Sequence, residues 1–158
     1  EARLVTWDEL DLGCKIWRVP AGKYKSNKQW DIPLTETTVR LLRSLPSYKT
    51  QSGHVFTTLA GKVIPDAYMS SLPDALGFDA VAHGFRSTFR TWGQEQQRFS
   101  EEALELSLKH CDTVGCRAAY ARSQLFDERC KVLEAYSEWV CEGHKTNNVT
   151  PIHTRRRV

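Results

Sequence analysis

Two polar residues in the middle of the chain, His83 and Arg86, have the types and the spacing needed to act on a phosphate group. They lie three residues apart in the segment Ala82-His-Gly-Phe-Arg-Ser-Thr-Phe-Arg-Thr-Trp92. On a helix this spacing places both side chains on one face. A guanidinium binds two phosphate oxygens as a fork, and an imidazole moves a proton near neutral pH. Taken alone the pair is a weak signal, because a capping histidine and a surface arginine are common.

A second histidine and a tyrosine follow further along the chain. His110 ends the segment Leu104-Glu-Leu-Ser-Leu-Lys-His110, and Tyr120 comes ten residues later. Alanines flank Tyr120 and leave room around its hydroxyl group. A lone tyrosine is usually a core aromatic, so a functional interpretation depends on its combination with His83, Arg86 and His110.

Together these residues resemble the catalytic domain of the tyrosine recombinases. That family carries an H-x-x-R motif at the start of a helix, then a Leu-x-His segment, then a nucleophilic tyrosine. The matching residues here are His83-Gly-Phe-Arg86, Leu108-Lys-His110 and Tyr120, in the same order and at similar separations. The surrounding sequence is most similar to integrases of phages and genomic islands. The resemblance covers about residues 1–140.

The resemblance extends upstream to a β-hairpin that carries a lysine in this family. Tyr24-Lys25, a basic linker and Asp31-Ile-Pro-Leu-Thr35 are similar to that hairpin. Lys23 and Lys28 lie in the same stretch, and only the family register separates them from Lys25. The alternative for all three is a solvated basic loop that merely touches phosphate.

The resemblance implies cleavage and rejoining of DNA strands without a metal or a cofactor. Tyr120 would attack a phosphodiester to form a 3′-phosphotyrosine, with His83 as its general base. Arg86 would hold the non-bridging oxygens, His110 would donate a further hydrogen bond to them, and Lys25 would protonate the leaving 5′-oxygen. The implied partners are double-stranded DNA attachment sites and, on DNA, other copies of the full-length protein in a tetramer.

The family pattern also contains an earlier arginine, in a Gly-x-Arg-x-x-Glu motif. The residues Glu1-Ala-Arg-Leu-Val-Thr-Trp-Asp8 resemble the part that begins at that glutamate. Arg3 does not match the motif. We therefore expect an amino-terminally truncated domain whose first catalytic arginine precedes Glu1, and little activity from the fragment alone.

Two other functions stay open on the sequence. One is a DNA-binding or regulatory module that keeps the fold without turnover, since the first arginine is missing. The other is a type IB topoisomerase, which shares the phosphoryl-transfer chemistry. The integrase-like form of the His83 and Tyr120 segments favours the recombinase over the topoisomerase.

Length and composition restrict the class of protein. The chain has 158 residues, of which 41% are hydrophobic and 26% charged, as in one globular domain. No apolar run approaches the roughly 20 residues that span a bilayer, and no secretory pattern begins the chain. We therefore expect a cytoplasmic protein with no membrane partner, and the resemblance to the recombinases implies a bacterial protein at the nucleoid. The net charge of +3 neither requires nor excludes DNA. Five cysteines without a C-x-x-C pair favour reduced thiols over a metal site.

The elements that must position these residues follow from hydrophobic periodicity. The segments 15–20 and 30–34 read as strands of a small antiparallel sheet. Thr35 can cap a helix that ends before Pro46, and residues 54–58 read as a short buried strand or extended segment. Further helices are expected at 66–76, 83–97, 101–110, 114–122 and 125–142.

The predicted fold class is therefore α+β, with a small antiparallel sheet followed by a mainly helical body. The catalytic domain is expected at residues 1–142. Residues 143–158 lack an apolar period and include Arg155-Arg-Arg157, so we expect a mobile carboxyl-terminal tail there.

Overall fold

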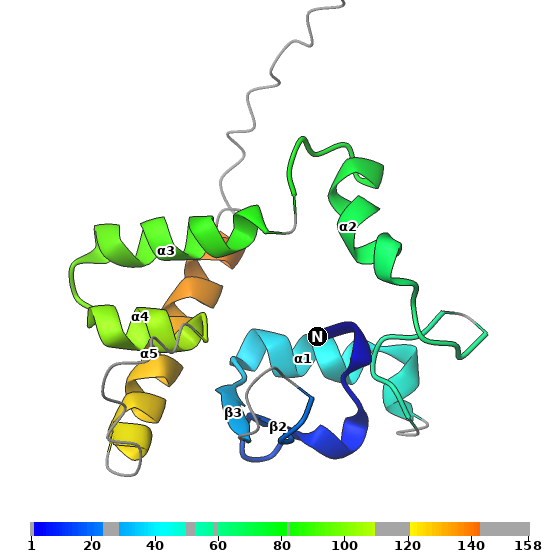
Figure 1. Cartoon of the computed structure of the whole chain (residues 1–158), viewed down its shortest axis with the longest axis horizontal. Helices are drawn as coiled ribbons and strands as arrows, with labels where there is room; N and C mark the ends of the chain where they lie inside the picture. Colours follow the sequence, from blue (N-terminus) through cyan, green and yellow to red (C-terminus); the bar gives the residue numbers. More distant parts are fainter. Residues whose placement is uncertain are drawn as a thin grey trace, which may run out of the picture.

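The structure is a computed structural model, and it describes residues 2–23, 29–49, 53–58, 60–81, 83–109 and 121–142. It confirms the α+β class, since a small sheet from the first part of the chain is followed by a mostly helical body (Figure 1). The predicted tail lies outside the described residues. None of the described helices is long and apolar enough to cross a membrane.

Three short antiparallel strands form the sheet, in the order β1-β2-β3. They are Leu10–Asp11 (β1), Ile16–Val19 (β2) and Trp30–Pro33 (β3). Val19 pairs with Trp30, so the chain between them closes a hairpin. Pro33 ends β3 at the edge of the sheet, where its missing N–H breaks no ladder. The two predicted strands are confirmed, whereas β1 is too short to show an alternating pattern.

Local capping begins helix α1, Glu36–Ser44. The hydroxyl of Thr35 accepts a hydrogen bond from the Thr38 N–H at 3.2 Å, as the sequence predicted. Val39 and Leu42 face the interior, while Leu41 is 57% exposed. Three 3-10 turns complete this part of the chain: Ala2–Leu4 (η1), Trp7–Glu9 (η2) and Pro46–Lys49 (η3).

A first hydrophobic core joins these elements. It consists of Val5, Trp7, Leu42 and Val55, and the Tyr48 ring packs at a tilt against Trp7 with ring centres 5.5 Å apart. Val55 is only 1% exposed, and the bridge between Thr6 and His54 holds its segment extended. The prediction for residues 54–58 is therefore confirmed.

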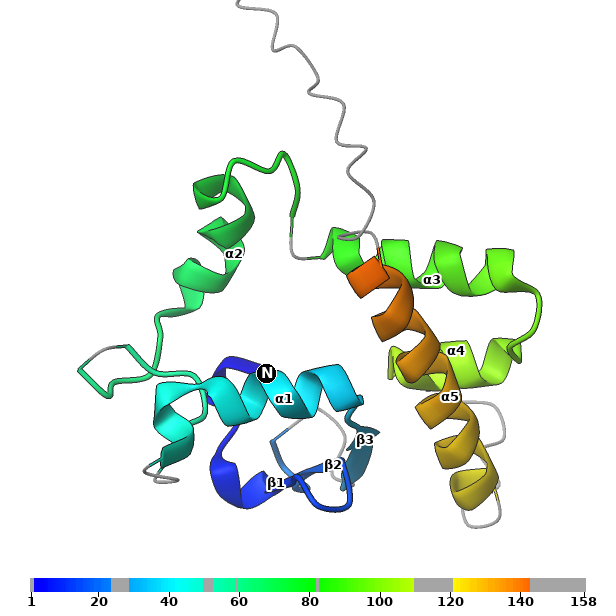
Figure 2. The same ribbon diagram turned by 180° about the vertical axis from the view of Figure 1, so that it is seen from behind.

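Four helices form the rest of the described chain: Asp66–Ala75 (α2), Gly84–Gln96 (α3), Glu101–Ser107 (α4) and Ala121–Glu142 (α5). Both views show α2 apart from the other three, which lie together (Figures 1 and 2). Helix α5 packs against α3, α4 and β3. Ser100 caps α4 through the N–H of Ala103 at 3.2 Å, which confirms a second predicted cap.

Two helix boundaries differ from the prediction. Most of the helix predicted at 114–122 lies outside the described residues, but its last two residues form one continuous helix with 125–142. Neither Ser123 nor Gln124 removes a backbone donor or favours a turn strongly enough to break that helix. Helix α4 ends at Ser107 instead of residue 110. Its end coincides with a left-handed backbone at Lys109, where φ is 58°.

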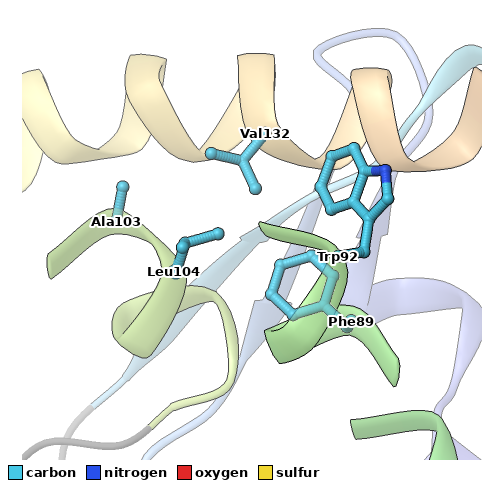
Figure 3. Close-up of a cluster of buried hydrophobic side chains, with 5 residues drawn as sticks. All are labelled: Phe89, Trp92, Ala103, Leu104 and Val132. Carbon is cyan, nitrogen blue, oxygen red and sulfur yellow. The ribbon is translucent and has the colours of Figure 1, made fainter. Parts of the chain in front are cut away.

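A second hydrophobic core lies where α3, α4 and α5 meet. Phe89 and Trp92 come from α3, and Ala103, Leu104 and Val132 complete the cluster (Figure 3). Tyr136 packs edge-on against Phe89 with ring centres 5.0 Å apart. Val132 of α5 is fully buried, whereas Val140, two turns further along the same helix, is 49% exposed.

Close packing at Gly93 predicts a measurable loss of stability on substitution. A Cβ at this position would lie 2.4 Å from Cδ2 of the buried Leu104. Overpacking of this kind costs about 1–3 kcal/mol, against a gain of about 1 kcal/mol in helix propensity. We expect Gly93→Ala to lower the free energy of unfolding, measured by chemical denaturation.

Gly84→Ala is the matched control, because it adds the same methyl group to the same helix. Its Cβ would lie 3.8 Å from the nearest atom, Cγ2 of Val81, which is ordinary contact. We expect this variant to be as stable as the parent or slightly more stable. A Gly93→Ala protein with unchanged or higher stability would contradict the packing described here.

Helix α5 is attached to the sheet through a buried arginine. Arg129 is 6% exposed, and its Nη2 donates to the carbonyl of Asp31 at 3.0 Å. Its guanidinium also lies over the Trp30 ring, 4.8 Å from the ring centre. Nearby, the Thr35 hydroxyl contacts the Ser137 hydroxyl at 3.3 Å. The helix that begins at Ala121 is thus fixed against the strand that closes the hairpin.

Candidate active site

His83 and Arg86 lie together at the start of α3, as predicted. The backbone of His83 is already helical, and its carbonyl accepts a hydrogen bond from the Arg86 N–H at 3.1 Å. His83 is exposed and Arg86 is half-buried. No capping hydrogen bond from the His83 imidazole is found within the described chain. The structural alternative of a capping histidine therefore has no support.

Arg86 connects the H-x-x-R motif to the Leu-x-His segment. Its Nη2 donates to the carbonyl oxygen of Leu108 at 2.7 Å, although the two residues are 22 positions apart. Leu108 follows the last turn of α4, where the helix dipole places partial negative charge. The bond uses one of the five N–H donors of a guanidinium. It places the arginine beside the chain that leads into His110.

The end of α4 is a tight left-handed turn. The N–H of Lys109 donates to the carbonyl of Leu106 at 3.0 Å, and the positive φ at Lys109 stops the helix. The turn closes α4 before His110. Because a lysine rarely adopts this conformation, no residue in this segment predicted that the helix would end here.

A second arginine holds α3 and α4 together one turn further along. Arg90 forms ion pairs with Glu101 and Glu105, both on α4. Gly93 then meets Leu104 in close contact. Three successive turns of α3 therefore contact α4, and the pair of helices forms one support for His83 and Arg86.

The three remaining predicted site residues, Lys25, His110 and Tyr120, lie outside the described residues. Their neighbours are described. Helix α5 begins at Ala121, directly after Tyr120, and β3 begins at Trp30, after the segment that contains Lys25. The contact of Arg129 with Trp30 and Asp31 joins these two elements.

The relatives of this chain in curated collections are integrases. The chain is 27% identical over 89% of its length to the prophage integrase IntA of Escherichia coli (strain K12). It is also 27% identical over 89% of its length to the integrase of Enterobacteria phage P4. With the integrase of Shigella phage Sf6 it shares 26% identity over 90%. The chain is therefore similar to phage and prophage integrases. It spans 35%, 36% and 38% of the length of these three integrases, respectively. No family model and no solved structure matches it.

Of the hairpin lysines, Lys23 is the one that the structure describes. Its Nζ forms an ion pair with Glu9 and donates to the carbonyl of Leu4 at 2.7 Å. This engagement favours a structural role for Lys23, which the sequence had left as an alternative to Lys25. The other alternative, Lys28, lies outside the described residues with Lys25.

Sequence reasoning missed two buried charged residues near these elements, Glu9 and Arg129. Both are charged, and both are buried, at 8% and 6% exposure. Charged residues are almost never buried unless they are paired. A weak signal for Glu9 was its place between Trp7 and the first strand, where an alternating pattern would turn it inward.

Proposed function

We propose that this chain is the catalytic domain of a tyrosine-type site-specific recombinase. It cleaves and rejoins DNA strands through a 3′-phosphotyrosine intermediate, and so mediates integration or excision of DNA. The observation that carries the proposal is the bond from Arg86 to the carbonyl of Leu108, because it brings the H-x-x-R motif to the Leu-x-His segment. The kinship with phage and prophage integrases supports the same reaction class.

In the proposed reaction, the Tyr120 hydroxyl attacks phosphorus and the bond to the 5′-oxygen breaks. His83 takes the proton of the tyrosine, and Lys25 gives a proton to the departing 5′-oxygen. The exposure of His83 suits this role, since the phosphate must reach it from solvent. Attack by a second 5′-hydroxyl on the phosphotyrosine reverses the steps and joins the strands.

Arg86 and His110 stabilise the charge on the non-bridging oxygens. Half-burial of Arg86 and its bond to Leu108 orient the guanidinium before DNA arrives, so that little reorganisation accompanies the reaction. The first turn of α3 adds partial positive charge on the same side. His110 follows the Leu108-Lys109 turn and completes the set.

The proposed partners are double-stranded DNA attachment sites and other copies of the complete protein, assembled as a tetramer on DNA. No metal or cofactor takes part, because fixed cationic side chains stabilise the phosphate. The proposed place of action is the bacterial cytoplasm, at the nucleoid.

Formation of a covalent protein–DNA complex tests this proposal. A duplex nicked a few nucleotides to the 3′ side of the cleavage point traps the complex, since the short fragment that carries the released 5′-hydroxyl diffuses away and cannot rejoin. A DNA-linked species on a denaturing gel is expected from the complete gene product. If the protein binds DNA but forms no such species, it is a binding module. If it relaxes supercoils but never exchanges strands between two sites, it is a topoisomerase.

Binding of the chain to duplex DNA is expected to weaken steeply with salt. Each phosphate neutralised adds about −0.9 to the slope of log K against log salt concentration. Several basic side chains near the proposed site would therefore produce a clear slope, even though the net charge is only +3. Fluorescence anisotropy of a labelled duplex at increasing salt measures it. An affinity that stays constant from low to moderate salt would contradict this expectation.

A further inference from the structure

Glu9 is a buried carboxylate at the base of the hairpin. The Trp17 Nε1–H donates to its Oε2 at 2.9 Å, and the Thr6 hydroxyl donates to its Oε1 at 3.0 Å. Lys23 completes the set with an ion pair to the same Oε1. A carboxylate buried in this way is stable only with such partners. Glu9 therefore joins η2, strand β2 and the start of the hairpin segment.

The Lys23 ammonium makes two contacts with the amino-terminal part of the chain. It bonds Glu9, 14 residues earlier, and the carbonyl of Leu4, 19 residues earlier. Its side chain is 27% exposed, so the pair is partly shielded from water. On the opposite side of the hairpin, Trp30 pairs with Val19 and lies under Arg129. Lys23 and Trp30, which stand on either side of residues 24–28, thus both have contacts with the rest of the fold.

We propose that Glu9 is a positioning residue for the general acid of the reaction. By holding Lys23, two residues before Lys25, it fixes the chain close to the acid. This inference rests on the proposed function. A general acid acts only within hydrogen-bond distance of the oxygen it protonates. Loss of the Glu9 anchor therefore weakens protonation of the leaving 5′-oxygen and leaves nucleophilic attack intact.

A leaving group that needs no proton separates these two effects. In a DNA substrate with sulfur in place of the bridging 5′-oxygen, the tyrosine–phosphorus bond forms and the phosphorus–sulfur bond breaks. The sulfur departs as a thiolate and needs no proton from an acid, because thiols are far more acidic than alcohols. The ratio of the sulfur and oxygen cleavage rates, measured on the complete gene product, thus reports on the general acid.

Glu9→Gln keeps the size of the side chain and removes its charge. We expect about a tenfold slower cleavage of the oxygen substrate, as part of the 10²–10⁴-fold that general acid–base catalysis contributes. Cleavage of the sulfur substrate should stay within about twofold of the parent, since it needs no acid. Glu36→Gln is the matched control, because it removes another lysine–glutamate pair, Lys15 with Glu36 at 2.8 Å, from the same part of the fold. It should change neither rate.

Equal slowing of both substrates by Glu9→Gln, or no slowing of either, would overturn the inference. If Glu9→Gln does not fold, Lys23→Met removes the same ion pair from its more exposed end. Equal slowing of both substrates by Lys23→Met, or no slowing of either, would then overturn the inference. Two further variants report separately on the proposed function. Tyr120→Phe should cleave neither substrate, and the sulfur substrate should rescue Lys25→Ala. If Lys25→Ala is not rescued while Glu9→Gln is, the acid is a different residue and the anchor stands.

Discussion

Tyr120→Phe is expected to abolish covalent attachment to DNA while folding and DNA binding stay nearly unchanged. The substitution removes one hydroxyl group, and no other group is proposed to attack phosphorus. The variant should give no DNA-linked band on a denaturing gel with the nicked duplex. Its thermal unfolding and its anisotropy titration should match those of the parent protein.

Tyr136→Phe is the matched control for this experiment. Tyr136 packs with Phe89 and Trp92 in the second core, and burial raises the pKa of its hydroxyl. A raised pKa disfavours the phenolate, which makes Tyr136 a poor nucleophile. The Tyr136→Phe protein should therefore still attach to DNA. A DNA-linked band from Tyr120→Phe that disappears in the double variant would identify Tyr136 as the nucleophile instead.

Arg86→Lys is expected to slow cleavage by about a hundredfold or more, which is the usual effect of removing one preorganised donor from a transition state. A lysine keeps the positive charge but lacks the planar fork. It cannot bond the Leu108 carbonyl and two phosphate oxygens in the same fixed geometry. Single-turnover cleavage of the nicked duplex measures the rate, and thermal unfolding shows whether the fold is retained.

Arg90→Lys tests whether the effect is specific to the phosphate position. Arg90 lies one turn further along α3, and its partners are the carboxylates of Glu101 and Glu105. A lysine can replace much of such a partly exposed ion pair, which contributes roughly 0–1 kcal/mol. We expect a change of less than a few-fold in the cleavage rate. Similar rates for Arg86→Lys and the parent would remove Arg86 from the proposed site.

Features that depend on neighbouring residues in the sequence could be predicted. The hydroxyls of Thr35 and Ser100 cap α1 and α4 because a cap needs only the first turn that follows it. The placement of His83 and Arg86 on one helical turn followed from their spacing in the same way. The two hairpin strands were recognisable because β-rich segments flank a polar stretch.

Features that depend on distant contacts could not be predicted. Arg129 is buried because the Asp31 carbonyl and the Trp30 ring, nearly 100 positions earlier, accept its guanidinium. Glu9 is buried because Lys23 and Trp17 donate to it. No local sequence pattern indicates such partners, and a charged residue without a known partner is expected to be exposed to solvent. Lys25, His110 and Tyr120 stay predictions, since they lie outside the described residues.

The acceptor of the Arg86 bond is a main-chain oxygen, and this has an evolutionary consequence. Every amino acid supplies a carbonyl, so no point substitution at residue 108 can delete the acceptor, whereas no other side chain reproduces the guanidinium. Selection on the contact between α3 and the end of α4 therefore acts on Arg86 and on the path of the backbone. The side chain at residue 108 can drift as far as the second core permits, and the contact survives that drift.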